Sequence, residues 1–219
     1  ISSGTGSGQL RTISDYDGST KVATVSSAWT TNPDATSDYE VRSSSGNAEV
    51  KNSTSLNFAD VRVGGNFTAT AEGGAITCDV STACKLNIGG TTDVYSETDQ
   101  NIILDNAAND FIGDVKFRGG AVVIKDANDI EFGGGDSTAK DKLADSNGDE
   151  YALKVYAGDK ITDDNTDPSN LKVTGGNAWF GTNFGNEPAG SGDDATSRSR
   201  IVLDSSGNVF SGTTTLRGG

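Results

Sequence analysis

The chain has 219 residues and a formal charge of −14, and it contains 29 glycines, three prolines and neither His nor Met. This acidity argues against nucleic-acid partners and anionic membrane surfaces, because both would repel the chain. No apolar run approaches the roughly 18 residues of a membrane span, so no membrane insertion is expected. Although only 33% of the residues are hydrophobic, they are concentrated in short β-branched runs, which predict an all-β fold.

Residues 1–55 are predicted to form a small N-terminal β module behind a flexible Ser/Gly/Thr leader. The start at Ile1, in a chain without Met, is the pattern expected of a processed polypeptide. Asp17-Gly18 lies between two alternating runs and predicts a β-hairpin. Residues 42–54 are polar and are predicted to form a loop.

Two stretches of the N-terminal module are distinctive in sequence. They read Gly-Ser-Thr-Lys-Val-Ala-Thr-Val at residues 18–25 and Trp-Thr-Thr-Asn-Pro-Asp-Ala-Thr-Ser at residues 29–37. Through them, residues 10–41 resemble structural and tail-fibre proteins of tailed phages. The resemblance implies a module for attachment or trimerisation and makes a virion the alternative location.

Residues 56–219 are predicted to form a parallel β-solenoid (β-helix) core with C-terminal capping strands. Residues 102–135 hold two tandem copies of one pattern: a β-branched run, an Asp/Asn corner, a second apolar pair and a Gly pair. The run at Ile102 recurs 20 residues later at Val122, a period that suits one solenoid turn. The alternative is an antiparallel β-sandwich or jelly roll with Gly/Asp turns.

A shorter motif, apolar-x-apolar followed by Gly-Gly, marks further turns of the predicted solenoid. It occurs at residues 61–65, 86–90, 115–120, 130–134 and 171–176. The Gly pair is expected to supply the positive φ of a sharp corner, and Asn and Asp tolerate the same backbone region. Because the spacing drifts between copies, the repeat is degenerate.

Three quoted stretches carry a second resemblance. They read Val-Gly-Gly-Asn-Phe-Thr-Ala-Thr-Ala-Glu-Gly-Gly-Ala-Ile at 63–76, Leu-Asp-Asn-Ala-Ala-Asn-Asp-Phe-Ile-Gly-Asp-Val at 104–115 and Lys-Asp-Ala-Asn-Asp-Ile at 125–130. These stretches resemble repeats of filamentous-haemagglutinin-type bacterial adhesins over about residues 61–135. The resemblance implies a right-handed parallel β-helix on a cell surface.

The two cysteines, Cys78 and Cys84, are predicted to form a disulfide that closes a short loop. Two free thiols are the alternative, whereas zinc would need four ligands and finds no His or further Cys. A disulfide implies an oxidising compartment, so we expect an extracellular or cell-surface location.

The C-terminal third is less regular. Residues 136–143 are predicted to form a loop or short helix, and residues 151–156 a strand. Residues 179–185, rich in aromatics, are expected to cover one end of the core. Residues 201–217 are expected to form a final hairpin with a turn near 205–208.

The sequence predicts no enzymatic activity. Without His, neither a Ser-His-Asp nor a Cys-His arrangement can form. Asp126 with Asp129, or Asp105 with Asp110, could flank a glycosidic bond as in polysaccharide-cleaving β-helix enzymes. However, Asp at a solenoid corner already has a structural role. A polysaccharide-cleaving enzyme therefore stands as the alternative.

Calcium is the one cofactor for which the sequence offers a weak candidate site. Asp145, Asn147 and Asp149 place oxygens at alternating positions, as calcium loops do. The twelfth position of such a loop is Tyr156 instead of Glu. A solvated acidic turn is the alternative.

The expected function is that of an extracellular, self-assembling fibre, sheath or adhesin subunit, with a phage tail fibre as the alternative. Copies are expected to join head to tail by strand addition, because unpaired strand edges attract partners. Salt or calcium is expected to favour such polymers. Cell-surface glycans or a host receptor are the other expected partners. The candidate assembly residues are Leu10, Ile13, Val209, Phe210 and Leu216.

Overall fold

A computed structural model of the chain describes residues 1, 3–17, 20, 22–38, 42–43, 46–78, 84–138, 143–144, 150–163, 170–182 and 200–218. The described residues contain strands and turns but no helix, which confirms the all-β prediction. They form two compact units, Ile1–Val41 and Arg42–Gly219. The boundary precedes the predicted one at residue 55, because β4 (Ala48–Asn52) pairs in parallel with β7 (Phe67–Ala71) and so joins the second unit.

The first unit contains the predicted hairpin. Strands β1 (Ile13–Asp17) and β2 (Val22–Val25) run antiparallel, with Ile13 opposite Val25. The leader, predicted to be flexible, is held by hydrogen bonds: the terminal amino group of Ile1 donates to the carbonyl of Gln9 at 2.7 Å. An isolated antiparallel bridge also joins Ser3 to Asp38.

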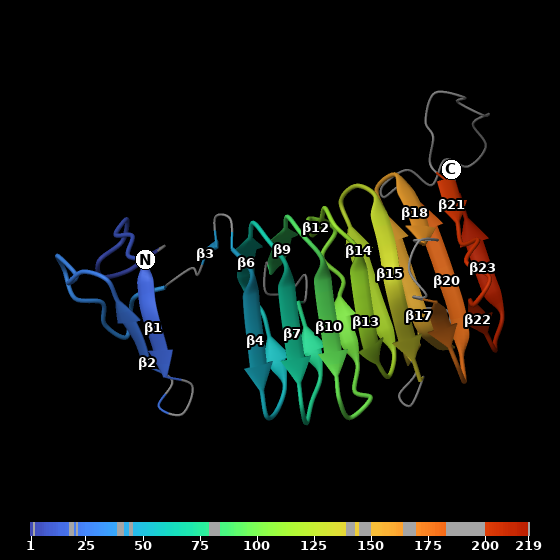
Figure 1. Cartoon of the computed structure of the whole chain (residues 1–219), viewed down its shortest axis with the longest axis horizontal. Coiled ribbons are helices and arrows are strands. Elements are labelled where there is room, and N and C mark those ends of the chain that lie inside the picture. The colour runs from blue at the N-terminus through green and yellow to red at the C-terminus, as the bar shows by residue number, and fades with distance from the viewer. Residues whose placement is uncertain are drawn as a thin grey trace. The chain divides into compact units, whose positions relative to one another are not determined.

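The second unit is a parallel β-solenoid built from three sheets, as predicted (Figure 1). The first sheet contains β3 (Arg42–Ser43), β6 (Asp60–Val63), β9 (Lys85–Ile88) and β12 (Asp110–Phe111). The second sheet contains β4, β7, β10 (Thr92–Ser96), β13 (Val115–Gly119), β15 (Ile130–Ser137), β18 (Lys160–Asp163), β19 (Leu171–Val173), β21 (Arg200–Val202) and β22 (Val209–Phe210). The third sheet contains β5 (Leu56–Asn57), β8 (Ile76–Thr77), β11 (Ile102–Leu104), β14 (Val122–Asp126), β16 (Leu143–Ala144), β17 (Glu150–Ala157), β20 (Asn177–Thr182) and β23 (Thr214–Arg217).

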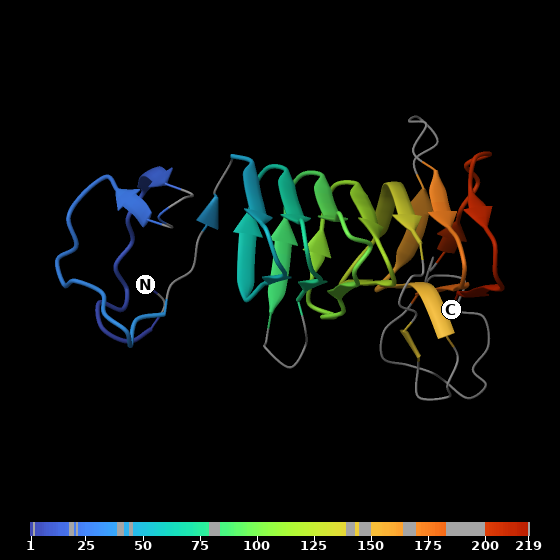
Figure 2. The same ribbon diagram turned by 90° about the horizontal axis from the view of Figure 1, so that it is seen from below.

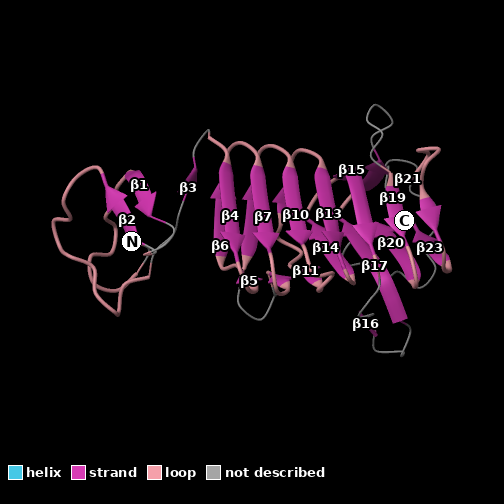
Figure 3. Cartoon of the chain, turned by 60° about the horizontal axis from the view of Figure 1, so that its bottom comes forward, coloured by secondary structure: helices cyan, strands magenta, loops and turns pink. Residues whose placement is uncertain are grey.

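From β3 to β12 the chain visits the three sheets in turn, and from β13 on its described strands belong to the second and third sheets. Each circuit forms a rung stacked on the previous one (Figure 2). Strands of one sheet lie side by side in chain order with two exceptions (Figure 3). The long β15 pairs with both β18 and β19, which β21 and β22 continue, and the short β16 runs antiparallel to β17. Ile102 pairs directly with Val122, which confirms the 20-residue repeat. Such parallel stacking needs a strand that returns to the same sheet one circuit later.

The core follows from alternation along each strand. In β7, β10 and β14 every second residue is buried, as expected where one face of a strand points inward. The inward residues form columns across the rungs, and one column contains Ile76, Ile102, Val122, Leu153 and Ala178, all at most 1% exposed. A narrow continuous core of this kind explains how a chain with few hydrophobic residues folds.

Corner glycines are required mainly by close stacking, which corrects the expectation of positive φ. Within the Gly-Gly motifs of the described residues, only Gly134 and Gly175 have positive φ, 134° and 83°. A Cβ on Gly90 would lie 2.3 Å from Oδ1 of Asn66 in the preceding rung. A Cβ on Gly113 would similarly lie 2.7 Å from the carbonyl carbon of Gly90.

The Gly-Gly motif also marks two different places in the rung. Val61 pairs with Leu86 in the first sheet, but Val115 pairs with Thr92 in the second sheet. The copies at 61–65 and 86–90 are therefore equivalent, and the copy at 115–120 is not. This difference explains why the spacing of the motif drifts.

Several predictions about irregular segments were wrong. Residues 42–54 contain β3 and β4 instead of a loop, residues 179–182 belong to β20 instead of an end cap, and β15 extends through Ser137. Residues 201–217 do not form a hairpin, because β21, β22 and β23 each pair in parallel with an earlier strand. The turn near 205–208 is confirmed by the Asn208 N–H, which donates to the carbonyl of Ser205 at 3.2 Å. The described part of the chain contains no helix with the length and apolarity of a membrane span.

Candidate ligand-binding groove on the second sheet

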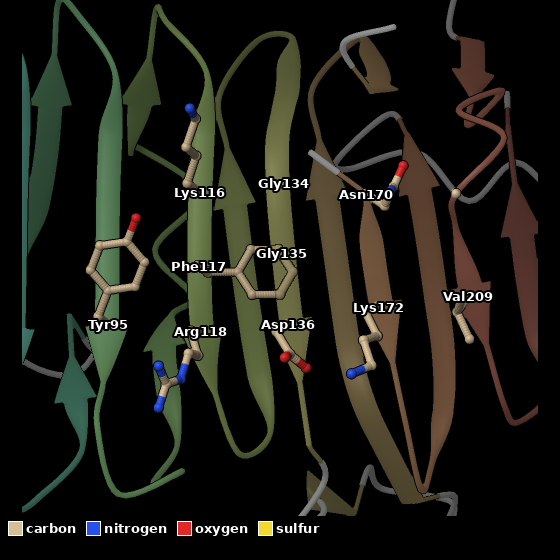
Figure 4. Close-up of a pocket in the computed structure, with 11 residues that line it drawn as sticks. Tyr95, Lys116, Phe117, Arg118, Gly134, Gly135, Asp136, Asn170, Lys172 and Val209 are labelled. Carbon is tan, nitrogen blue, oxygen red and sulfur yellow. The ribbon is translucent and has the colours of Figure 1, made fainter. Parts of the chain in front are cut away.

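A shallow groove of about 460 Å³ crosses the outer face of the second sheet (Figure 4). Gly134 and Gly135 of β15 form its floor, Lys116 and Arg118 of β13 lie on one side, and Lys172 of β19 lies on the other. Its remaining lining residues are Tyr95, Phe117, Asp136, Asn170, Gly207 and Val209.

The glycines of β15 create this groove. Gly134 pairs with Lys116 and Gly135 with Phe117, after a register shift beside Val115. A Cβ on Gly135 would lie only 2.2 Å from Cζ of Phe117, so glycine is needed to accommodate the buried ring. Gly134, next to Gly135 in β15, has no side chain to cover the outer face opposite Lys116. The outer face is therefore hollow between β13 and β19.

The groove is basic on a strongly acidic chain. Lys116, Arg118 and Lys172 line it, whereas Asp136 is its single carboxylate. At its edge, burial raises the pKa of Tyr95, and the neighbouring Asp93 raises it further. A local excess of cations beside partly desolvated groups favours an anionic ligand.

The lining residues do not supply the pair of carboxylates that was considered for a glycosidase. A glycosidase arrangement needs two carboxyl groups, and this lining contributes only Asp136. The sequence interpretation missed the groove, although it had a signal. Alternation in Val-Lys-Phe-Arg at residues 115–118 directs the two basic side chains outward, and the triple glycine at 133–135 follows one rung later.

Asp126, one of the candidate catalytic carboxylates, is a buried corner residue. It is 0% exposed, and its two oxygens accept the N–H groups of Phe111 and Asn128, both at 2.7 Å. Burial raises the pKa of Asp126 to about 7, although these two hydrogen bonds lower it. A glycan therefore cannot reach the carboxylate that was paired with Asp129.

The second candidate pair is similarly part of the corner structure. The carboxylate of Asp110 accepts hydrogen bonds from the side-chain amides of Asn87 at 3.0 Å and Asn128 at 3.2 Å. Asp110 thus links side chains from successive rungs. Asp105 is half-buried and lies just after β11.

The disulfide between Cys78 and Cys84 is present, with a Cα–Cα distance of 5.3 Å. Both cysteines are completely buried in the core. The disulfide indicates an oxidising environment.

The candidate calcium ligands Asp145, Asn147 and Asp149 lie outside the described residues. Within the residues that are described, no group of three or more His, Cys, Asp or Glu side chains could hold a metal ion.

The candidate assembly residues fall into three environments. Leu10 and Ile13 are exposed on the first unit, by 76% and 45%. Val209 and Leu216 are exposed on the last rung, by 48% and 55%. Phe210 is half-buried and packs edge-to-face on Phe180, with ring centroids 5.9 Å apart, so it extends the core.

Residues 45–117, about a third of the chain, match the family described as Repeats of unknown function (DUF5649). The match runs from β4 into β13 and so coincides with successive rungs. No curated protein and no solved structure matched the chain. The comparisons therefore identify a repeat family over the regular part of the solenoid.

Proposed function

We propose that this chain is a self-associating structural subunit of an extracellular fibre, sheath or cell-surface adhesin, without a catalytic role. The observation that supports this proposal is an open apolar core at the last rung. Leu216 of β23 pairs with the fully buried Phe180 of β20 and so takes an inward position. It is nevertheless 55% exposed, because no described strand stacks beyond β23.

The first rung of the solenoid has the same property. Val50 of β4 pairs with Ala69, which is completely buried, yet Val50 is 36% exposed. Among the described residues, each end therefore combines a strand edge that no other described strand pairs with an exposed inward side chain. The occupant that fits both ends is a second copy of the chain, whose first rung would continue the ladder of the last rung.

A contact between unlike ends is heterologous, so repeating it gives an open filament unless the rotation closes a ring. The charge of −14 per subunit opposes this contact. We therefore expect polymers to form at high salt or with calcium, which screen or bridge the carboxylates. Stacking would leave the outer face of the second sheet open, so a fibre would display the basic groove once per subunit.

The test compares two lysine substitutions on one strand. Leu216→Lys places a charge on the open end, whereas Thr215→Lys, beside Trp179 on the outer face, adds the same charge away from it. Sedimentation velocity and light scattering are measured over a range of protein concentrations at high salt. We expect polymers from the wild type and Thr215→Lys, and monomers from Leu216→Lys.

Two results would contradict the proposal: a wild-type chain that stays monomeric at every concentration and salt level, or a Leu216→Lys variant that polymerises like the wild type. Deletion of residues 1–14 separately tests Leu10 and Ile13. If the truncated chain polymerises unchanged, the solenoid ends suffice for the contact.

A further inference from the structure

The outer face of the third sheet carries a cluster of aromatic side chains. Tyr151 and Tyr156 lie on β17, and Trp179 lies on β20. Trp179 pairs with Lys154, and Tyr156 pairs with Gly181 on one side and with Lys125 on the other. All three aromatic side chains are half-buried. Tyr156 and Trp179 point outward, since their strand neighbours Val155 and Phe180 are completely buried.

The rings of Tyr156 and Trp179 form a platform that lies against the sheet. The ring centroids of Tyr156 and Trp179 are 4.4 Å apart, with a tilt of 42°. A Cβ on Gly181 would lie 2.0 Å from Cη2 of Trp179, so the indole covers this glycine. Gly181 thus allows the indole to lie flat, with one face against the sheet.

Lysines hold the rings in place. The Nζ of Lys154 lies 4.6 Å from the ring centroid of Tyr151, 5.8 Å from that of Trp179 and 5.9 Å from that of Tyr156. The Nζ of Lys125 lies 5.2 Å from the Tyr156 ring. Cation–π contacts of this kind fix both partners, so the platform and its charges are preorganised.

The charge of this surface is opposite to that of the chain. Strand pairing aligns two outward positions on each of the strands β14, β17, β20 and β23. None of these eight positions is acidic, although the chain has 31 acidic residues. These positions are Val123, Lys125, Lys154, Tyr156, Trp179, Gly181, Thr215 and Arg217.

We propose that this aromatic–lysine platform binds an acidic polysaccharide. Sugar rings present flat C–H faces that stack on Trp179 and Tyr156, and sugar carboxylates are placed to pair with Lys125 and Lys154. The platform extends across successive rungs, so an extended sugar chain can lie along the stacking direction of the solenoid. The inference is independent of self-association, because the platform lies on the side of the solenoid and is complete within one copy.

The test measures binding by the full-length chain at low salt, where charge repulsion keeps copies apart. Isothermal titration calorimetry compares a galacturonic-acid oligomer with a neutral cello-oligosaccharide of the same length and with oligothymidylate. The variants are Trp179→Ala, Trp179→Phe, Lys125→Ala and the matched control Lys85→Ala on β9 of the first sheet. We expect the uronate to bind at least about tenfold more tightly than either other probe.

Trp179→Ala and Lys125→Ala should each weaken uronate binding by about tenfold or more, whereas Trp179→Phe should retain part of it and Lys85→Ala all of it. Thermal unfolding followed by circular dichroism verifies that each variant is folded. Equal affinity for the neutral oligomer, tighter binding of oligothymidylate, an equal loss in Lys85→Ala, or no uronate binding by the wild type would each overturn the proposal.

Discussion

The buried Asp126 predicts that the solenoid becomes less stable as the pH rises from acid to neutral. Burial raises its pKa from 3.8 to about 7 in the folded chain, while the unfolded chain keeps a value of about 3.9. Well below pH 4 the carboxyl group is protonated in both states and has no net effect on folding. Between these two pKa values the folded state binds more protons, so the free energy of unfolding falls with increasing pH.

The size of this effect follows from the difference between the two pKa values. A difference of about 3 units corresponds to about 4 kcal/mol in full, of which about 2–3 kcal/mol develops between pH 5 and pH 8. Asp126→Asn should remove this dependence. The amide has one acceptor oxygen for the N–H groups of Phe111 and Asn128, so the variant also carries a penalty that does not change with pH.

The assay is urea unfolding at pH 5, 6, 7 and 8, followed by circular dichroism, for the wild type and Asp126→Asn. The quantity to read is the difference in unfolding free energy between the two proteins, because other titrating groups cancel in it. We expect Asp126→Asn to gain about 2–3 kcal/mol relative to the wild type over this range. A constant difference would show that Asp126 stays ionised, and the reasoning from burial would then be refuted.

Two further predictions concern the corners and the core. Gly90→Ala should lower the free energy of unfolding by about 1–3 kcal/mol, because its Cβ would lie 2.3 Å from Oδ1 of Asn66, the acceptor for Thr91 N–H. Ile112→Ala near the same corner, where Ile112 is 70% exposed, should change it by at most about 0.5 kcal/mol; equal effects in urea unfolding would reject the stacking explanation. Reduction of the Cys78–Cys84 disulfide should cost about 2 kcal/mol in the same assay. Intact mass without reductant should be two hydrogen masses below the reduced value, and labelling of both thiols under native non-reducing conditions would contradict the disulfide.

The sequence by itself determined the local features of this protein. Alternation around Asp17-Gly18 identified the β1–β2 hairpin, and the recurrence of the Ile102 run at Val122 identified both the solenoid and one of its registers. The spacing of Cys78 and Cys84 likewise predicted their disulfide. Each of these features depends on near neighbours or on a repeat that is visible in the chain itself.

Only the tertiary structure decided which positions meet between rungs. The buried ring of Phe117 requires glycine at position 135, and the glycines of β15 leave the basic groove open. Trp179 lies outside the third sheet instead of capping the core. β23 pairs in parallel with β20, and the two residues that face each other, Ala178 and Thr214, are 36 residues apart in the chain. The physical reason is that, in a solenoid, burial and hydrogen bonding are completed by residues one circuit away, and the length of a circuit varies with the loops between strands.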